Sequence, residues 1–207
     1  MDNCGSFKKK AETVKQKIEN NFSDVKKIEN IIDEFKDDQR TITFIKYYNS
    51  IVLDKEKIDF GTFKAKWAIQ GMTREVYSFF NNNFDKLRDE IIKDKNIDSF
   101  YKNYCCTERN ETIFCCKLFH VILPHEFPPI DNNIIKHFKL KEENKMNSYK
   151  IIKYGYELFI NKNEDIINQI KKVLLKDEYK YIRIKELSNY RILDMIYWFI
   201  LNRRNGI

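Results

Sequence analysis

Glycine and proline are scarce in this sequence, which has five glycines and three prolines among 207 residues. Residues that interrupt helices are therefore few. No run of about eighteen uncharged apolar residues occurs, which excludes a membrane-spanning helix. The longest apolar stretch, ILDMIYWFIL, includes Asp194. The start, MDNCGSFKKKAETVKQK, has no apolar run after its basic residues, so we expect no secretory signal and a cytoplasmic location.

Cysteine spacing also argues against a metal site. The five cysteines are Cys4 and two adjacent pairs, Cys105-Cys106 and Cys115-Cys116, and none forms the CxxC pattern that wraps a metal. We expect reduced, packed thiols, and neither a bound metal nor a cofactor. A Cys-His nucleophile formed by Cys116 and His120, four residues apart on a helix, is an alternative that lacks a third orienting residue.

Apolar residues recur at spacings of three and four over most of the chain, which predicts a predominantly helical protein. The 43% hydrophobic and 14% aromatic content supports a globular core. We expect an all-α fold, a compact multi-helix array with at most short peripheral strands, such as one over residues 179–184. The expected helices cover residues 23–38, 41–53, 57–70, 73–82, 84–94, 97–105, 111–123, 131–140, 146–161, 163–175 and 185–202.

Composition changes near residue 40. The first 40 residues are charge-rich and thinly apolar, whereas residues 41–140 hold the aromatic concentration and all three prolines. We therefore expect residues 1–40 to form a helical hairpin packed on a main helical domain over residues 41–207.

Lys117 stands in the densest apolar passage of the chain, within ETIFCCKLFHVI. On a helix its neighbours at three and four positions include Phe114, His120 and Val121. Its ammonium either reaches water past an apolar surface or lies at the floor of a cleft with a lowered pKa. The sequence around Lys117 is compatible with both interpretations.

Asp131 follows Lys117 across a rigid turn, LPHEFPPID. Pro124 ends the first helix, and Pro128 and Pro129 hold an extended link before Asp131. Asp131 stands where the N-cap of the next helix belongs. One interpretation is therefore simple capping, and the other is a site shared with Lys117.

This order of a helical lysine, an apolar run, a proline-rich turn and an aspartate at a helix start resembles helix-hairpin-helix DNA glycosylases, especially the lyase-type branch with oxidised-guanine glycosylases. Lys117 matches the family's nucleophilic lysine, and PPID ending in Asp131 matches its turn and aspartate. The resemblance covers about thirty residues. The family's hairpin is usually glycine-rich, whereas CTERNETIF before Lys117 has no glycine. Arg109 and a helix N-terminus around residues 110–112 would then contact DNA phosphate instead.

The resemblance implies a DNA glycosylase-like fold and the excision of a damaged or modified base, in repair or in defence against invading DNA. Lys117 would attack the sugar carbon that bears the base and form a Schiff base. Asp131 would stabilise the cationic sugar or move a proton. The base would be flipped out of the duplex into a pocket. Candidate residues for contacting it are Trp67, Tyr101, His120, His125 and Phe127.

The charge balance favours an anionic partner, because 38 Lys and Arg against 31 Asp and Glu leave a net charge of +7. Basic and aromatic residues interleave in FGTFKAKWAIQGMTREVYSFF, a pattern that can supply phosphate contacts. DNA is the expected partner, and no membrane is expected. The candidate contacts are Lys64, Lys66, Arg74, Arg109 and Asn132. The alternative is a non-catalytic helical module that binds nucleic acid or protein, with Lys117 reaching solvent and Asp131 only capping.

Overall fold

The computed structural model describes residues 3–53, 58–67, 69, 72–106, 111–140 and 144–205. The fold is 81% helical, and these ranges contain no strand, so the all-α prediction is confirmed. The α-helices are α1 (Asn3–Phe22), α2 (Val25–Asp33), α3 (Gln39–Leu53), α4 (Phe60–Lys66), α5 (Arg74–Asp94), α6 (Ile97–Phe100), α7 (Thr112–Ile122), α8 (Asn132–His137), α9 (Lys145–Lys162), α10 (Glu164–Leu174) and α11 (Asn189–Asn205). The described residues also include a π-helical turn, η2 (Tyr101–Cys105), and two 3₁₀ helices, η4 (Asp177–Ile182) and η5 (Ile184–Glu186).

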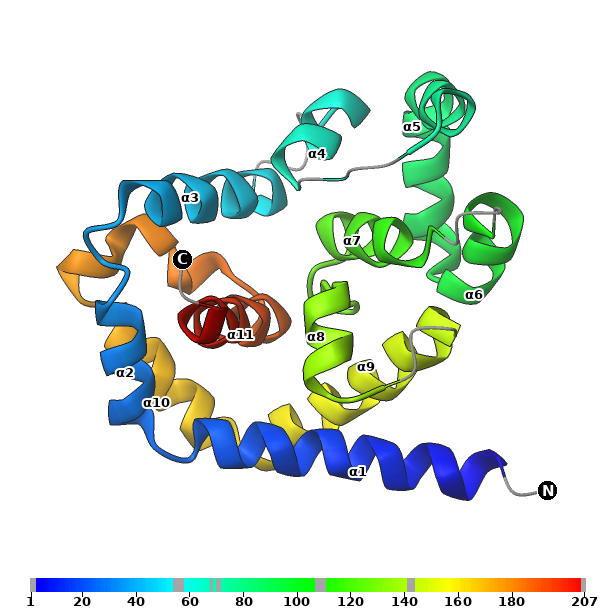
Figure 1. The fold of residues 1–207 in the computed structure, drawn as a ribbon. Coiled ribbons are helices and arrows are strands. Elements are labelled where there is room, and N and C mark those ends of the chain that lie inside the picture. Colours follow the sequence, from blue (N-terminus) through cyan, green and yellow to red (C-terminus); the bar gives the residue numbers. More distant parts are fainter. Residues whose placement is uncertain are drawn as a thin grey trace.

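Helix α11 lies at the centre of the molecule, with α2, α3, α8, α9 and α10 arranged around it (Figure 1). From Ile192 to Ile200 its residues are buried except for Asp194 and Trp198, which are partly exposed. A helix that is apolar on nearly all sides belongs inside a bundle. Arg191, Asp194 and Trp198 are spaced by three and four residues, so they share one face of this helix. That face forms a wall of the candidate site described below.

Helix α5 is continuous, which corrects the predicted break between residues 73–82 and 84–94. The sequence NNNFD predicts a loop between two helices, because asparagine side chains often compete for the hydrogen bonds of a helix backbone. Here the Asn83 side chain donates to the carbonyl of Phe79, 2.8 Å away and four residues earlier. Phe80, Phe84 and Leu87 are buried on one face and hold the helix against the core. Tertiary packing therefore decides the conformation.

Residues 179–182 and 184 lie in two 3₁₀ helices separated by Arg183, so the predicted short strand is wrong. Tyr179 and Ile182 are both buried and three residues apart, the repeat of a 3₁₀ turn. Arg183 has φ of 56°, a left-handed conformation that a strand does not allow. The Tyr179 hydroxyl bonds to the carboxylate of Asp33, and the carbonyl of Ile182 accepts a bond of 2.9 Å from Asn49. These side-chain bonds tie the segment to α2 and α3.

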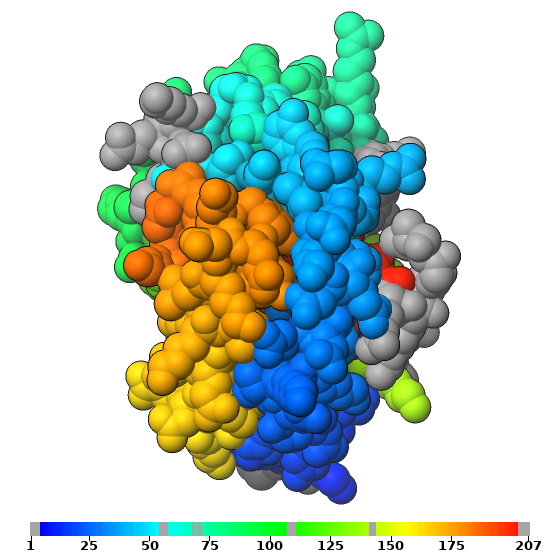
Figure 2. Space-filling model, turned by 90° about the vertical axis from the view of Figure 1, so that its left-hand side faces the viewer, coloured from blue at the N-terminus to red at the C-terminus, as the bar shows by residue number. Residues whose placement is uncertain are grey.

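The N-terminal helices pack on the C-terminal third of the chain. Helix α1 contacts α9, and α2 contacts α10 and α11. In Figure 2 the blue surface of α2 and α3 lies beside the orange surface of α10 and η4. One hydrophobic core runs from Ala11 in α1 to Ile200 in α11. No helix within the described residues is both long enough and apolar enough to span a bilayer.

Gly155 permits the close approach of α1 and α9. A Cβ atom at this position would lie 2.6 Å from Cγ1 of Val14 and 3.0 Å from the carbonyl oxygen of Ala11. We expect Gly155→Ala to lower the free energy of unfolding by about 1–3 kcal/mol, because overpacking outweighs the better helix propensity of alanine. Urea unfolding measures this change. Gly5→Ala is the control, since nothing lies within 4 Å of its Cβ, and an equal loss in both variants would contradict the packing argument.

Candidate active site

Lys117 reaches a pocket from the middle of α7. The residues around it, Phe114, Cys116 and Leu118, are buried, whereas Lys117 is partly exposed. Its Nζ donates a hydrogen bond of 3.1 Å to the carbonyl of Trp67, which follows α4. Of the two sequence interpretations, the structure therefore favours a lysine in a cleft.

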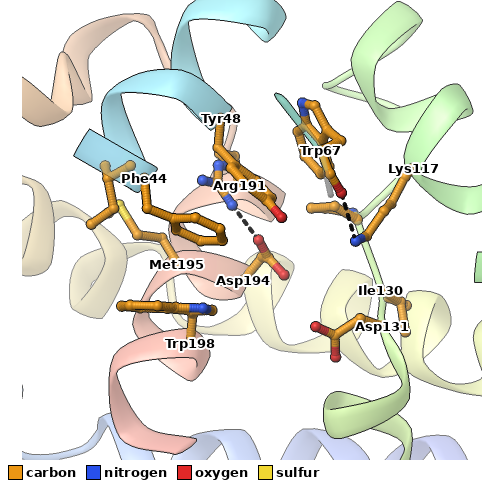
Figure 3. Close-up of a pocket in the computed structure, with 12 residues that line it drawn as sticks. Phe44, Tyr48, Trp67, Lys117, Ile130, Asp131, Arg191, Asp194, Met195 and Trp198 are labelled. Atoms are coloured by element: carbon orange, nitrogen blue, oxygen red, sulfur yellow. Dashed lines mark hydrogen bonds and ion pairs between the residues drawn. The ribbon is translucent and has the colours of Figure 1, made fainter. Parts of the chain in front are cut away.

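Asp131 both caps a helix and lines the same pocket. One carboxylate oxygen accepts a hydrogen bond of 3.0 Å from the backbone N–H of Ile134, which confirms the predicted N-cap of α8. Pro129 and Ile130, just before it, also line the pocket. Figure 3 shows Lys117 and Asp131 directed toward the same space from α7 and the start of α8. The proline-rich turn thus brings the two predicted residues together.

The opposite wall carries a second pair of charges from α11. The Arg191 guanidinium forms an ion pair with Asp194, and its Nε donates a bond of 2.9 Å to the side-chain oxygen of Asn49 in α3. Its centre lies 5.4 Å from the ring of Tyr48 and 5.5 Å from the ring of Trp67, distances typical of cation–π contacts. Arg191 is therefore held by four groups from three elements.

Aromatic side chains form the remaining walls. The rings of Phe44 and Trp198 stack with centroids 5.1 Å apart and an interplanar angle of 25°, and Tyr48 lies 4.8 Å from Trp67. Together these groups form a pocket lined by Phe44, Ile45, Tyr48, Trp67, Lys117, Pro129, Ile130, Asp131, Arg191, Asp194, Met195 and Trp198. Its volume of about 60 Å³ is smaller than the roughly 150 Å³ of an engineered cavity that binds benzene. The walls of the pocket therefore combine flat aromatic surfaces with charged side chains.

Burial changes the protonation of the two central groups. It lowers the pKa of Lys117, and the nearby carboxylates of Asp131 and Asp194 oppose this change. It also raises the pKa of Asp194 to about 7, which the Arg191 charge opposes. The pocket therefore holds an amine that loses its proton more easily than usual and an acid that keeps its proton longer than usual. Such groups suit nucleophilic and acid–base chemistry near neutral pH.

Trp67, a predicted substrate contact, lines this pocket, whereas Phe44, Tyr48, Asp194 and Trp198 also line it but were not predicted as contacts. A usable signal existed, because two charged residues and a tryptophan share one face of an otherwise apolar helix.

Four other residues predicted to contact a substrate do not line this pocket. His120 is fully buried behind Trp67, with ring centroids 5.5 Å apart, and Nδ1 donates a bond of 2.7 Å to the carbonyl of Phe127. Phe127 is buried against Phe119. Tyr101 lies in η2, and His125 is exposed beside a different hollow near Tyr190. Their contact with a substrate stays a prediction.

The Cys-His alternative is not supported by the arrangement of its two residues. Burial raises the pKa of the Cys116 thiol well above its usual range, and His120 uses Nδ1 for Phe127. A thiol that stays protonated is a poor nucleophile. Within the described part of the chain, no group of three or more His, Cys, Asp and Glu side chains is arranged to hold a metal ion.

The predicted nucleic-acid contacts are spread over several elements. Lys64 and Lys66 lie in α4, Arg74 begins α5, and Asn132 begins α8 as an exposed residue. Lys66 lies beside the pocket, in a groove that shares Phe44 and Tyr48 with it. Arg109 falls outside the described residues.

His120 should make stability depend on acidity. Burial lowers its pKa to about 3, below the unfolded value near 6.5, so the unfolded chain takes up the proton first. The contribution of neutral His120 is therefore present above pH 6.5 and is lost as pH falls toward 3. We expect a loss on the order of 3 kcal/mol between pH 7 and pH 4, measured by urea unfolding relative to His120→Asn. This variant keeps a donor for Phe127, and parallel curves for the two proteins would contradict the prediction.

Comparison of the chain with models of known protein families, with curated protein sequences and with solved structures finds no match.

Proposed function

We propose that this protein is a DNA glycosylase-like enzyme that excises a damaged or modified base through a Schiff base on Lys117. The observation that carries the proposal is the shared pocket, which the Lys117 amine and the Asp131 carboxylate both line together with aromatic side chains (Figure 3). A nucleophilic amine beside a carboxylate is the chemistry that opening a glycosidic bond requires. The net charge of +7 supports DNA as the partner.

The pocket walls support a flipped base as the ligand. A base removed from the duplex needs flat apolar surfaces for its faces and polar groups for its edge. Phe44, Tyr48 and Trp198 offer the surfaces, and Asp194 offers hydrogen bonds to the edge. The free volume of about 60 Å³ is smaller than a nucleobase needs, so side chains of the pocket walls must move outward when the base enters.

Lys117 must be a neutral amine to act as a nucleophile. Burial lowers its pKa, so the neutral form is more abundant at a given pH than for a lysine in water. The Trp67 carbonyl holds Nζ on the pocket side of α7 by a hydrogen bond that a neutral amine can still donate. The same contact therefore positions the amine without requiring its positive charge.

The proposed reaction uses both residues. Nζ of Lys117 forms a bond to C1′ of the sugar while the C1′–N bond breaks, and its electron pair leaves with the base, which takes up a proton. Asp131 as a carboxylate stabilises the positive charge that develops on the sugar. Loss of a proton from the attached nitrogen and opening of the sugar ring then give a Schiff base, which water hydrolyses.

The test is excision and trapping on a panel of DNA substrates. The wild-type protein is incubated with duplex and single-stranded oligonucleotides that carry oxidised, alkylated or deaminated bases or an abasic site, with and without borohydride. We expect release of at least one modified base and a covalent protein–DNA adduct only when borohydride is present. A protein that releases no base and forms no adduct on any substrate, at low salt and across pH 6–9, would overturn the proposal.

A further inference from the structure

A second concave surface adjoins the pocket and is not used by the proposed reaction. We define the Tyr47 groove by its lining residues, which are Phe44, Tyr47, Tyr48, Thr62, Ala65 and Lys66. It has a volume of about 450 Å³ and lies between α3 and α4. Phe44 and Tyr48 also line the pocket, so the two spaces share a wall. The groove is therefore close to any ligand that enters the pocket.

The groove combines a flat apolar surface with a positive charge. Tyr47 is 52% exposed, so about half of its surface is open to solvent. The Lys66 Nζ lies 5.6 Å from the Tyr47 ring centroid and donates a bond of 3.1 Å to the hydroxyl of Ser50. Ser50 is neutral, and within the described residues no carboxylate pairs with Lys66. The charge of Lys66 is therefore available to an anionic ligand.

An exposed aromatic ring beside an unneutralised lysine is the combination that binds an unstacked nucleotide. Base–aromatic stacking tolerates any base, and a lysine beside the ring contacts phosphate without reading sequence. Flipping one base out of a duplex leaves its neighbour on the same strand with one exposed face. We propose that the Tyr47 groove binds the nucleotide next to the flipped base, with its base stacked on Tyr47 and its phosphate at Lys66. This assignment rests on the proposed glycosylase function.

The experiment measures binding without chemistry. Fluorescence anisotropy follows labelled DNA with a reduced abasic site, which cannot form a Schiff base, in single-stranded and duplex form. We expect Tyr47→Leu to weaken binding by at least about fivefold and Tyr47→Trp to retain it. Lys66→Gln should reduce the slope of log affinity against log salt by about 0.7 to 0.9. The matched control is Phe79→Leu, an exposed ring in α5 that stacks on Tyr104 and lies outside the groove.

The outcomes separate this inference from the proposed function. Tyr47-dependent binding by a protein that excises no base supports the groove and rejects the glycosylase. Excision by a protein whose Tyr47→Leu variant binds as tightly as the wild type rejects the groove alone. Absence of DNA binding at low salt overturns both. A wild-type dimer that Tyr47→Leu converts to a monomer would assign the groove to a second copy of the chain and overturn the inference.

Discussion

Replacing Lys117 by alanine is expected to reduce base excision by roughly a thousandfold or more and to abolish the borohydride-trapped adduct. The reason is that the nucleophile is removed, and the remaining groups cannot form a Schiff base. Folding should be nearly intact, with a stability change of about 1 kcal/mol, because Lys117 is partly exposed and gives up one hydrogen bond. Single-turnover rates and thermal unfolding of the same preparations measure both quantities.

Controls separate the amine from general effects of lysine removal. The matched control for Lys117→Ala is Lys153→Ala, since Lys153 is also partly buried but pairs with Glu157 on α9, away from the pocket.

Asp131→Asn keeps a side-chain oxygen for the cap of α8, so this variant should fold normally while excision falls by roughly 10²–10⁴-fold. Wild-type excision should rise with pH as Lys117 loses its proton, with a midpoint below 10.5. Wild-type rates in Lys117→Ala would show that the amine is not the nucleophile.

Replacing Arg191 by leucine is expected to cause the largest loss of stability, about 3–5 kcal/mol. The substitution leaves the Asp194 carboxylate and the Asn49 side-chain oxygen without their partner in a largely apolar wall. The pKa of Asp194 is already raised to about 7 and would rise further without the guanidinium. A raised folded pKa means stability that is present at low pH and lost as pH rises, so the defect should be larger at pH 9 than at pH 6.

Urea unfolding of two further variants identifies the cause of this loss. Arg191→Lys keeps a positive charge but loses the bond from Nε to Asn49, so an intermediate loss is expected. The double variant Arg191→Leu/Asp194→Leu removes both charges and should recover part of the stability lost in Arg191→Leu. If the double variant is instead less stable than Arg191→Leu, the ion-pair explanation is contradicted.

Most of the helical framework follows from local patterns in the sequence. Spacings of three and four in segments such as α2 and α10 mark a core face, and the two helices bury Ile28, Ile31, Ile167 and Ile170 as that pattern requires. The failures arose where tertiary contacts decide the conformation. Asn83 in α5 bonds within its helix, and Tyr179 in η4 is held by Asp33, a residue 146 positions earlier.

For a similar reason, only part of the candidate site could be predicted from the sequence. A single proline-rich turn connects the helix that carries Lys117 to the helix that Asp131 caps. Because of this short connection, the sequence could predict that the two residues share a pocket. Phe44 and Asp194 come from α3 and α11, which are distant in the chain and meet only in the folded bundle. Spacing within one helix cannot reveal such a meeting. Spacing does show that Arg191, Asp194 and Trp198 share one face of α11. This side of the pocket could therefore have been predicted from the sequence.

The most direct test of the central claim is to locate the reduced adduct on the chain. Wild-type protein is trapped with borohydride on an abasic-site oligonucleotide, digested with nuclease and protease, and its peptides are sequenced by mass spectrometry. The proposed mechanism predicts a sugar remnant on Nζ of Lys117. Adducts found on Lys66, on the N-terminal amine or on scattered surface lysines, with an unmodified Lys117, would contradict it.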